Sequence, residues 1–309
     1  MKAICIDQAG NLDSPALMDV PVPAIDADEV LVRVKAIGVG LHDRWFIPRI
    51  ADYPYVIGIE AAGIIDKTGR AVAGYRPGDA VMFTSSLQSK GGVWAEFAAV
   101  REEALIHIPA GLGFIPAAAL PVAGGTALEA MKLLDLKPGA GVFMAGASGA
   151  IGTLTIQLAR SLNCRVAASA SAKNHDYLRS LGAEKTVDYH DPDWVGRIRD
   201  WMPGGVDAAL AIQPGTGIDC LQVVRDGGRL VTVSGDQVPP QRGIHVGQVL
   251  PGPESRARLA HLASEVALGH IHVEIEEVYP FERGIEALEK TETRHARGKI
   301  ILTTGPEPA

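Results

Sequence analysis

The sequence lacks the features that mark several specialised classes of protein. Its 309 residues contain no cluster of lysines and arginines, and the formal net charge is -7. Proteins that bind nucleic acids through the phosphates need such clusters, so we expect no nucleic-acid partner. No apolar run approaches the length of about 20 residues that crosses a membrane. We therefore expect no membrane partner either.

Cysteine is scarce as well. The chain has only Cys5, Cys164 and Cys220, an odd number of residues that lie far apart in the sequence. This argues against a disulfide framework and against a cysteine-rich zinc lobe. The amino-terminal residues alternate like a strand and reach Asp7 too early for the apolar region of a signal peptide. We expect a protein of a reducing compartment, the cytoplasm.

What the sequence does have is 47% hydrophobic residues, enough for a large core, and a length that suggests two domains. Residues 1–112 contain short strand-like stretches separated by Gly and Pro, which predicts a mostly β domain. After Pro116 a helical stretch runs to about Leu134, and apolar strands then alternate with helices. This rhythm predicts an α/β fold with a doubly wound parallel sheet. The strands are expected at residues 141–146, 165–169, 185–188, 207–211 and 229–234.

The first of these strands leads directly into a glycine-rich loop, residues 146–152, and a helix begins inside the loop. Backbone N–H groups at a helix N-terminus can bind a pyrophosphate if no side chain stands in the way. Gly149 and Gly152 suit the tight turn and the close-packing point, although Ala147 takes the place of the first glycine in the most familiar fingerprint. The helix is expected to bury an apolar stripe of Ile151, Leu154, Leu158 and Leu162. The loop residues expected to bind a dinucleotide are Gly146, Ser148, Gly149, Ala150, Ile151 and Gly152.

The choice of coenzyme depends on the end of the next strand. Folds that bind NAD place an acidic residue about 20 positions after the glycine loop, where it accepts hydrogen bonds from the ribose hydroxyls. Residues 168–173 stand at that place and contain no carboxylate. Ser171 and Lys173 instead offer a hydroxyl and an ammonium group, which suit a 2′-phosphate. The sequence therefore predicts NADPH, with the adenosine end surrounded by Ser169, Ser171, Lys173 and Tyr189.

Ordered motifs occur along nearly the whole chain, at residues 30–39, 58–63, 76–81, 91–97, 120–127, 181–183 and 297–302. Together with the glycine loop they resemble the medium-chain dehydrogenase/reductase superfamily, and most of all its zinc-independent quinone oxidoreductase branch. The resemblance implies a GroES-like substrate domain made of residues 1–112 and 269–309. It implies a Rossmann NADPH-binding domain, residues 113–268, inserted between them.

The resemblance also implies roles for single residues. The N–H groups of Ala150 and Ile151 hold the pyrophosphate, and Thr126 lies near the nicotinamide ribose. Ile212 and Gln213 are expected beside the cofactor, and Ser234 and Gly235 are expected to reach its nicotinamide end. Family members usually form homodimers by pairing the edge strands of their Rossmann sheets, and the edge expected here contains Ile244, Val246 and Val249.

Two positions bear on a metal. Zinc alcohol dehydrogenases of the superfamily place a cysteine and a histidine where this chain has Gly40 and Ile59. Residues 83–92 also lack the four cysteines of the structural zinc lobe. We therefore expect no metal. Without a Lewis acid to stabilise an alkoxide, hydride transfer to a conjugated acceptor is favoured over alcohol oxidation.

The residues expected to meet the acceptor lie just after Gly40. Quinone oxidoreductases of this family often carry Asn and Tyr where this chain has Gly40 and Trp45. Trp45 either offers a flat face to an aromatic acceptor or fills the core of the β domain. His42 and Tyr53 are candidate proton donors to the reduced acceptor, with a solvent proton as the alternative. Asp43 is expected to make structural hydrogen bonds.

These residues predict an NADPH-dependent oxidoreductase that transfers hydride to a small molecule, a quinone or another conjugated carbonyl acceptor, without zinc. One alternative is a reductase of the same fold that acts on the C=C bond of an alkenal, an enone or an enoyl thioester. A second alternative is a non-catalytic NADPH-binding redox sensor, because a fold and a coenzyme site do not by themselves define an acceptor.

Overall fold

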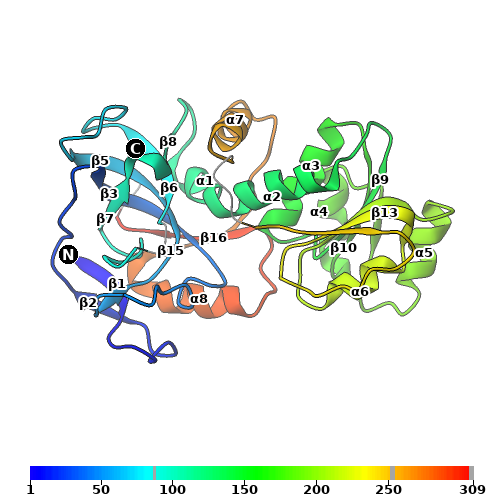
Figure 1. Cartoon of the computed structure of the whole chain (residues 1–309), viewed down its shortest axis with the longest axis horizontal. Helices are drawn as coiled ribbons and strands as arrows, with labels where there is room; N and C mark the ends of the chain where they lie inside the picture. Colours follow the sequence, from blue (N-terminus) through cyan, green and yellow to red (C-terminus); the bar gives the residue numbers. More distant parts are fainter. Residues whose placement is uncertain (86–87, 251–254, 306–309) are drawn as a thin grey trace. The chain divides into compact units, whose positions relative to one another are not determined.

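The computed structural model describes all residues except 86–87, 251–254 and 306–309. The internal contacts divide the chain into two compact units, each traceable in Figure 1. Unit 1 consists of Met1–Val122, Arg256–His270 and Ile275–Ala309. Unit 2 consists of Ala123–Ser255 and Ile271–Glu274. Residues 113–122 and most of the helix that begins at Ser255 thus group with unit 1, whereas we expected them in the Rossmann portion.

Unit 1 is mostly β. A seven-stranded sheet has the strand order β15-β16-β3-β5-β6-β8, with β7 paired to β3, and a three-stranded sheet has the order β2-β1-β4. The strands are β1 (Lys2–Ile6), β2 (Ala16–Asp19), β3 (Glu29–Val39), β4 (Tyr55–Val56), β5 (Glu60–Thr68), β6 (Ala80–Thr84), β7 (Phe97–Arg101), β8 (Leu105–His107), β15 (Ile275–Pro280) and β16 (Lys299–Thr303). Its helical segments are η1 (Glu102–Ala104), α1 (Phe114–Ala118), α7 (Ser255–Ala267), η3 (Phe281–Arg283) and α8 (Gly284–Glu292).

The core of unit 1 is built around the indole of Trp94, which is fully buried. The neighbouring backbone passes so close that a Cβ atom on Gly58 would lie 1.8 Å from the Trp94 Cδ1 atom. Gly58 also has a φ of +96°, a conformation that other residues rarely adopt. Glycine is therefore required at this position both by the backbone and by the packing.

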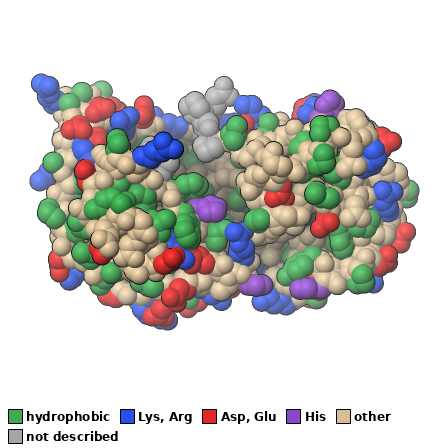
Figure 2. Space-filling model, turned by 60° about the horizontal axis from the view of Figure 1, so that its bottom comes forward, with side chains coloured by type: hydrophobic (Ala, Val, Ile, Leu, Met, Phe, Trp, Pro, Cys, Tyr) green, Lys and Arg blue, Asp and Glu red, His purple; other side chains and the backbone are tan. Residues whose placement is uncertain are grey.

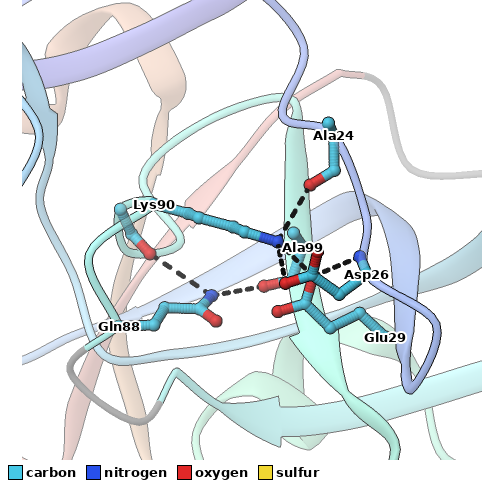
Figure 3. A network of polar contacts seen from close by, with 7 residues as sticks. Ala24, Asp26, Glu29, Gln88, Lys90 and Ala99 are labelled. Carbon is cyan, nitrogen blue, oxygen red and sulfur yellow. Dashed lines mark hydrogen bonds and ion pairs between the residues drawn. The ribbon is translucent and has the colours of Figure 1, made fainter.

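A polar network joins the start of β3 to the loop before β7 (Figure 3). The Lys90 Nζ atom donates to Asp26 at 2.7 Å, to the buried carboxylate of Glu29 at 2.6 Å and to the Ala24 carbonyl at 3.2 Å. Burial alone lowers the pKa of Lys90, but its hydrogen bonds and its attraction to the two carboxylates outweigh burial and raise the pKa. Because Lys90 stays charged, the buried Glu29 carboxylate keeps a counter-ion.

Helix α7 belongs to unit 1 through specific contacts. The Arg256 Nη2 atom donates to the Tyr75 hydroxyl at 2.6 Å, and that hydroxyl donates to the Leu105 carbonyl at 2.8 Å. The Tyr75 ring stacks on His107 with 4.4 Å between ring centroids. These contacts fasten the start of α7 to the β sheet, and periodicity alone gives no sign of them.

Unit 2 is the predicted doubly wound sheet. Six parallel strands follow the order β11-β10-β9-β12-β13-β14. The strands are β9 (Gly141–Ala145), β10 (Arg165–Ser169), β11 (Lys185–Val187), β12 (Val206–Ala211), β13 (Val224–Thr232) and β14 (His245–Gln248). The helical segments are α2 (Pro121–Leu134), α3 (Ala150–Ser161), η2 (Ala172–Asn174), α4 (His175–Ser180), α5 (Trp194–Trp201) and α6 (Thr216–Leu221).

The alternation of β9 explains why helices cover both faces of this sheet. Val142 and Met144 pack in one cluster with residues of α2, α3 and α4. Phe143 and Ala145 pack in another with residues of α5 and α6. Successive side chains of a strand point to opposite faces, so a strand that is apolar throughout must be covered on both.

Two details differ from the predicted helices. The helical stretch before Leu134 consists of two helices, α1 and α2. The second begins at Pro121, and proline is common at the first position of a helix because the N–H that it lacks would have no partner there. The predicted stripe on α3 is wrong at its end: Leu162 lies outside the helix and is 45% exposed. The buried residues of α3 are Gly152, Thr153, Leu154, Thr155, Ile156 and Ala159, so of the predicted stripe only Leu154 is fully buried.

Two properties of the described residues bear on the expected partners: the distribution of charged side chains and the apolar length of the helices. Figure 2 shows lysines and arginines interspersed with aspartates and glutamates over one face of the molecule. Among the described helices, none combines the length and the apolar character needed to span a membrane.

Candidate active site

The glycine loop connects β9 to α3. After β9 ends at Ala145, Gly146 adopts a φ of +78°, and the Ala147 N–H donates to the Ser169 carbonyl at 3.0 Å, which ties the loop to β10. Helix α3 follows with Gly149 as its N-cap residue, and no side chain caps it. The first N–H groups of a helix have no partner within the helix. Those of α3 are therefore left to a ligand or to water.

The glycines of this loop have different physical roles. A Cβ atom on Gly152 would lie 2.5 Å from the Ala147 backbone, so the helix and the loop can meet only at a glycine. A Cβ atom on Gly149 would come no closer than 3.9 Å to any neighbour. The protein itself leaves the space over Gly149 open, and this suits the approach of a pyrophosphate to the helix N-terminus. The loop residues therefore fit a dinucleotide.

At the end of β10 the predicted adenosine residues gather around one turn. Ser169 is buried, Lys173 is exposed on η2, and Tyr189 is 48% exposed beyond β11. The structure adds Asp188, whose carboxylate accepts a hydrogen bond from the Ala172 N–H at 3.1 Å. The sequence window missed this residue because it directly follows the next strand, β11, which only the fold places beside the turn.

At the other end of the sheet edge, the loops after β12 and β13 meet. A Cβ atom on Gly146 would lie 2.6 Å from the Gln213 Cγ atom, so the Gln213 side chain rests against the glycine loop. Ile212 is buried, Ser234 is exposed, Gly235 has a φ of +80°, and Thr126 is half-buried on α2. The predicted residues after β12 thus lie beside the glycine loop.

Sequence reasoning also missed Asp236, which joins these two loops. Its Oδ1 atom accepts hydrogen bonds from the Gly215 N–H at 3.0 Å and from the Ser234 hydroxyl at 3.3 Å, and its Oδ2 atom accepts one from the Gly217 N–H at 2.9 Å. Burial alone raises the pKa of Asp236, but the hydrogen bonds outweigh burial and hold the pKa below its ordinary range. An ionised Asp236 thus fixes the start of α6 to the end of β13.

In unit 1 the predicted acceptor residues lie on the loop between β3 and β4. Trp45 is 47% exposed and Tyr53 is 37% exposed, and the structure adds Phe46 and Ile50 as exposed apolar neighbours in the chain. Trp45 therefore does not fill the core. The Arg44 guanidinium lies 5.1 Å from the Trp45 ring centroid and pairs with Glu292 at 2.7 Å. We call this exposed set, Trp45, Phe46, Ile50 and Tyr53, the aromatic loop face.

His42 lies at the edge of this face. Its ring meets the Phe46 ring edge-on, with 5.3 Å between centroids. Partial burial, and to a lesser extent the nearby Arg294 guanidinium, lower the pKa of His42 below its ordinary value of 6.5. The imidazole is therefore neutral at neutral pH, and it can hold a hydrogen bond more readily than it can release a proton.

Behind this loop Asp43 is buried. Its Oδ2 atom accepts hydrogen bonds from the Gly40 N–H and from the Trp94 Nε1–H, both at 2.9 Å, which is the structural bonding we expected. A Cβ atom on Gly40 would lie 2.6 Å from the Asp43 Oδ1 atom, so the carboxylate occupies the space that a larger side chain at residue 40 would need. Burial raises the pKa of Asp43 to about 7, although the Lys299 ammonium opposes this.

Lys299 and Glu60 form a buried ion pair close to Asp43, and the Glu60 Oε2 atom also accepts the Val122 N–H at 2.7 Å. Glu60 follows Ile59, which stands where the zinc enzymes carry histidine. Within the described part of the chain no group of three or more His, Cys, Asp or Glu side chains is arranged to hold a metal ion. Residues 86–87 of the stretch in which we expected no zinc lobe lie outside that part.

Comparison with known proteins supports both halves of this description. Residues 26–110 match the alcohol dehydrogenase GroES-like domain, and residues 181–302 match a family described as zinc-binding dehydrogenase. The chain is 30% identical to the chloroplastic NADPH-dependent alkenal/one oxidoreductase of Arabidopsis thaliana, over 98% of this chain and 79% of that protein. It is 28% identical to the chloroplast envelope quinone oxidoreductase homolog of the same plant, over 92% of each chain.

The solved structures give the same answer. The quinone oxidoreductase from Coxiella burnetii superposes with a TM-score of 0.89 at 27% identity and covers 99% of both chains. A GroES-like unit and a Rossmann unit with an open glycine loop define a pyridine-nucleotide oxidoreductase, and the chain belongs to the medium-chain dehydrogenase/reductase superfamily. Within the superfamily it is quinone oxidoreductase-like.

The two glycines of the loop provide a matched pair of variants. We expect Gly149→Ala to cost less than about 1 kcal/mol of folding free energy but to weaken coenzyme binding about tenfold, since the new methyl group stands where the pyrophosphate approaches. Gly152→Ala should cost about 2 kcal/mol, because the loop backbone must move. Urea unfolding and fluorescence titration with NADPH measure both effects. Normal binding by Gly149→Ala, or normal stability of Gly152→Ala, would contradict these roles.

Asp43 should make stability depend on pH. Its pKa is about 7 in the folded protein against an ordinary value of 3.8, so between these values unfolding releases a proton. The free energy of unfolding should therefore fall as pH rises from about 4 to about 7, by up to about 1.4 kcal/mol per pH unit. In Asp43→Asn this contribution disappears. Urea unfolding at a series of pH values measures it, with the exposed Asp52→Asn as the control, and an unchanged profile in Asp43→Asn would refute the assignment.

Proposed function

We propose that this protein is an NADPH-dependent reductase that transfers hydride to a quinone or a similar conjugated carbonyl compound, without zinc. The observation that carries the proposal is the open helix N-terminus over Gly149, which fits a dinucleotide, in a chain of the quinone oxidoreductase-like branch. We propose a reaction without zinc because neither Gly40 nor Ile59 offers a metal ligand.

In this proposal the glycine loop holds the pyrophosphate through the Ala150 and Ile151 N–H groups, and Gln213, Ser234 and Gly235 orient the nicotinamide end. The bound coenzyme supplies the hydride. Ser171, Lys173 and Tyr189 offer donors to a 2′-phosphate, which supports NADPH over NADH. The name of the 30% identical relative, an NADPH-dependent enzyme, points the same way.

The aromatic loop face is the part of unit 1 that we assign to the acceptor. Trp45, Phe46 and Tyr53 present flat or apolar surfaces that a planar conjugated ring can stack against. A reduced quinone also needs a proton. The lowered pKa of His42 leaves that side chain to orient the acceptor oxygen with an N–H group, and Tyr53 or a solvent molecule then supplies the proton.

A second candidate is reduction of a C=C bond conjugated to a carbonyl group. The specific observation in its favour is the alkenal/one oxidoreductase that is 30% identical over nearly the whole chain. Both reactions place a hydride on a conjugated acceptor, so the two candidates differ in the acceptor and not in the coenzyme half of the site.

The deciding experiment is NADPH consumption by purified, metal-free protein with naphthoquinone, phenanthrenequinone, an alkenal and an enoyl thioester, with NADH run alongside. We expect fast turnover of the quinones with NADPH preferred. Selective turnover of the alkenal or the thioester would favour the second candidate. Tight NADPH binding without turnover of any acceptor would instead support a non-catalytic redox sensor.

We also propose that the protein forms a homodimer through β14 and resides in the cytoplasm. Strand β14 ends the order of the described sheet and pairs with β13 alone among its strands, and Val246 on it is 38% exposed. An open strand edge of this kind favours pairing with a second copy. Three buried cysteines without disulfides support a reducing compartment.

The dimer can be tested with one charge. Val246→Asp places a carboxylate on the exposed edge strand, and in a symmetric dimer the two new charges would face the same interface. We expect this variant to sediment as a monomer at concentrations where the wild type is dimeric. Ile218 is an exposed apolar residue on α6, and the variant Ile218→Asp serves as the control. A monomeric wild type, or a Val246→Asp variant that remains dimeric, would rule out this interface.

A further inference from the structure

The turn that we assign to the 2′-phosphate holds a carboxylate of the protein itself. The Asp188 Oδ2 atom accepts the Ala172 N–H at 3.1 Å, and Ala172 stands between Ser171 and Lys173, the two proposed phosphate donors. Successive backbone N–H groups at a turn attract anions. In this protein the Asp188 carboxylate already accepts a hydrogen bond from one of these groups, the Ala172 N–H.

Several contacts fix Asp188 in that position. The Ala170 N–H donates to the Val187 carbonyl at 3.2 Å, so the ends of β10 and β11 stay side by side. The Asp188 Oδ1 atom interacts with the His190 backbone N–H at 2.9 Å and with the His190 Nδ1 atom at 2.8 Å. The side chain is 27% exposed. The carboxylate is thus held beside the turn by Ala172 on the turn and by His190 in its own loop.

Charge at the turn therefore has both signs. The hydrogen bonds from His190, followed by that from Ala172, hold the pKa of Asp188 below its ordinary range despite some burial, so the group is ionised at neutral pH. The cation on the same turn is Lys173, which is exposed. A 2′-phosphate bound to this turn would gain from the Lys173 ammonium and lose from the Asp188 carboxylate. A ribose hydroxyl carries no charge and would lose nothing.

We propose that Asp188 is a specificity-determining residue that weakens the preference for a 2′-phosphorylated coenzyme and keeps NADH usable. The inference rests on the proposed function, because it assumes a dinucleotide on this sheet edge. The window after β10 contains no acid, but Asp188 places a carboxylate at the same turn. The missing acid taken alone therefore overstates the preference for NADPH. The acid directly follows β11 and already accepts a hydrogen bond from the turn.

The variant that isolates charge from structure is Asp188→Asn, since the amide oxygen can still accept the Ala172 N–H. We expect it to bind NADPH about fivefold more tightly than the wild type, from the removal of one charge near a phosphate in partly exposed surroundings, and NADH within about twofold. Lys173→Met should shift the ratio in the opposite direction. Fluorescence titration at one fixed pH and ionic strength gives the dissociation constants.

Asp191→Asn is the matched control, because Asp191 lies in the same loop, has a side chain that is 28% exposed and pairs with Arg197 instead of with the turn. It should change neither constant. Calorimetric titration with 2′,5′-ADP and with 5′-AMP repeats the comparison without the nicotinamide. The selectivity change should persist with these fragments.

The outcomes separate the two proposals. If the wild type binds NADPH or NADH and Asp188→Asn leaves the ratio of their dissociation constants unchanged, the role of Asp188 is refuted while the proposed function stands. If the variant weakens both coenzymes equally, Asp188 only braces the turn and the inference is again refuted. If the wild type binds neither coenzyme, the proposed function itself fails, and the selectivity role falls with it.

Discussion

The site depends on the close approach of helix α3 to the loop that precedes it. At Gly152 there is no room for a single methyl group between helix and loop backbone, whereas at Gly149 the same helix end opens to space. Close packing on one side and an open surface on the other are what let backbone N–H groups face a ligand. The remaining site residues of unit 2 are placed relative to this junction, since β10 and β12 both flank β9.

Two aspartates have the same structural role along this sheet edge: each connects two neighbouring loops. Asp188 links the end of β11 to the turn after β10, and Asp236 links the end of β13 to the turn after β12. Each carboxylate accepts backbone N–H groups of a neighbouring loop, and these hydrogen bonds favour its ionised form. Loops at the ends of strands are therefore held by charge-assisted hydrogen bonds where no apolar core can reach them.

Much of the fold could be read from the sequence. The apolar strands 141–146 and 165–169, the glycine loop and the alternation of strand and helix predicted the parallel sheet, because periodicity and glycine spacing are local signals. Leu162 was wrongly included in the buried stripe of α3, because periodicity does not say where a helix ends. Asp236 went unnoticed because nothing in its neighbourhood marks it, and its partners lie on another loop.

The sequence by itself determined the superfamily, the order of the motifs and the position of the glycine loop between strand and helix, since each depends on neighbours along the chain. Only the tertiary structure decided that Trp45 is exposed, that the Asp43 carboxylate fills the space beside Gly40, and that Asp188 stands beside Ser171 and Lys173. The reason is physical. Burial, steric exclusion and the interaction between charges depend on distance in space, and parallel strands bring together residues from separate parts of the chain.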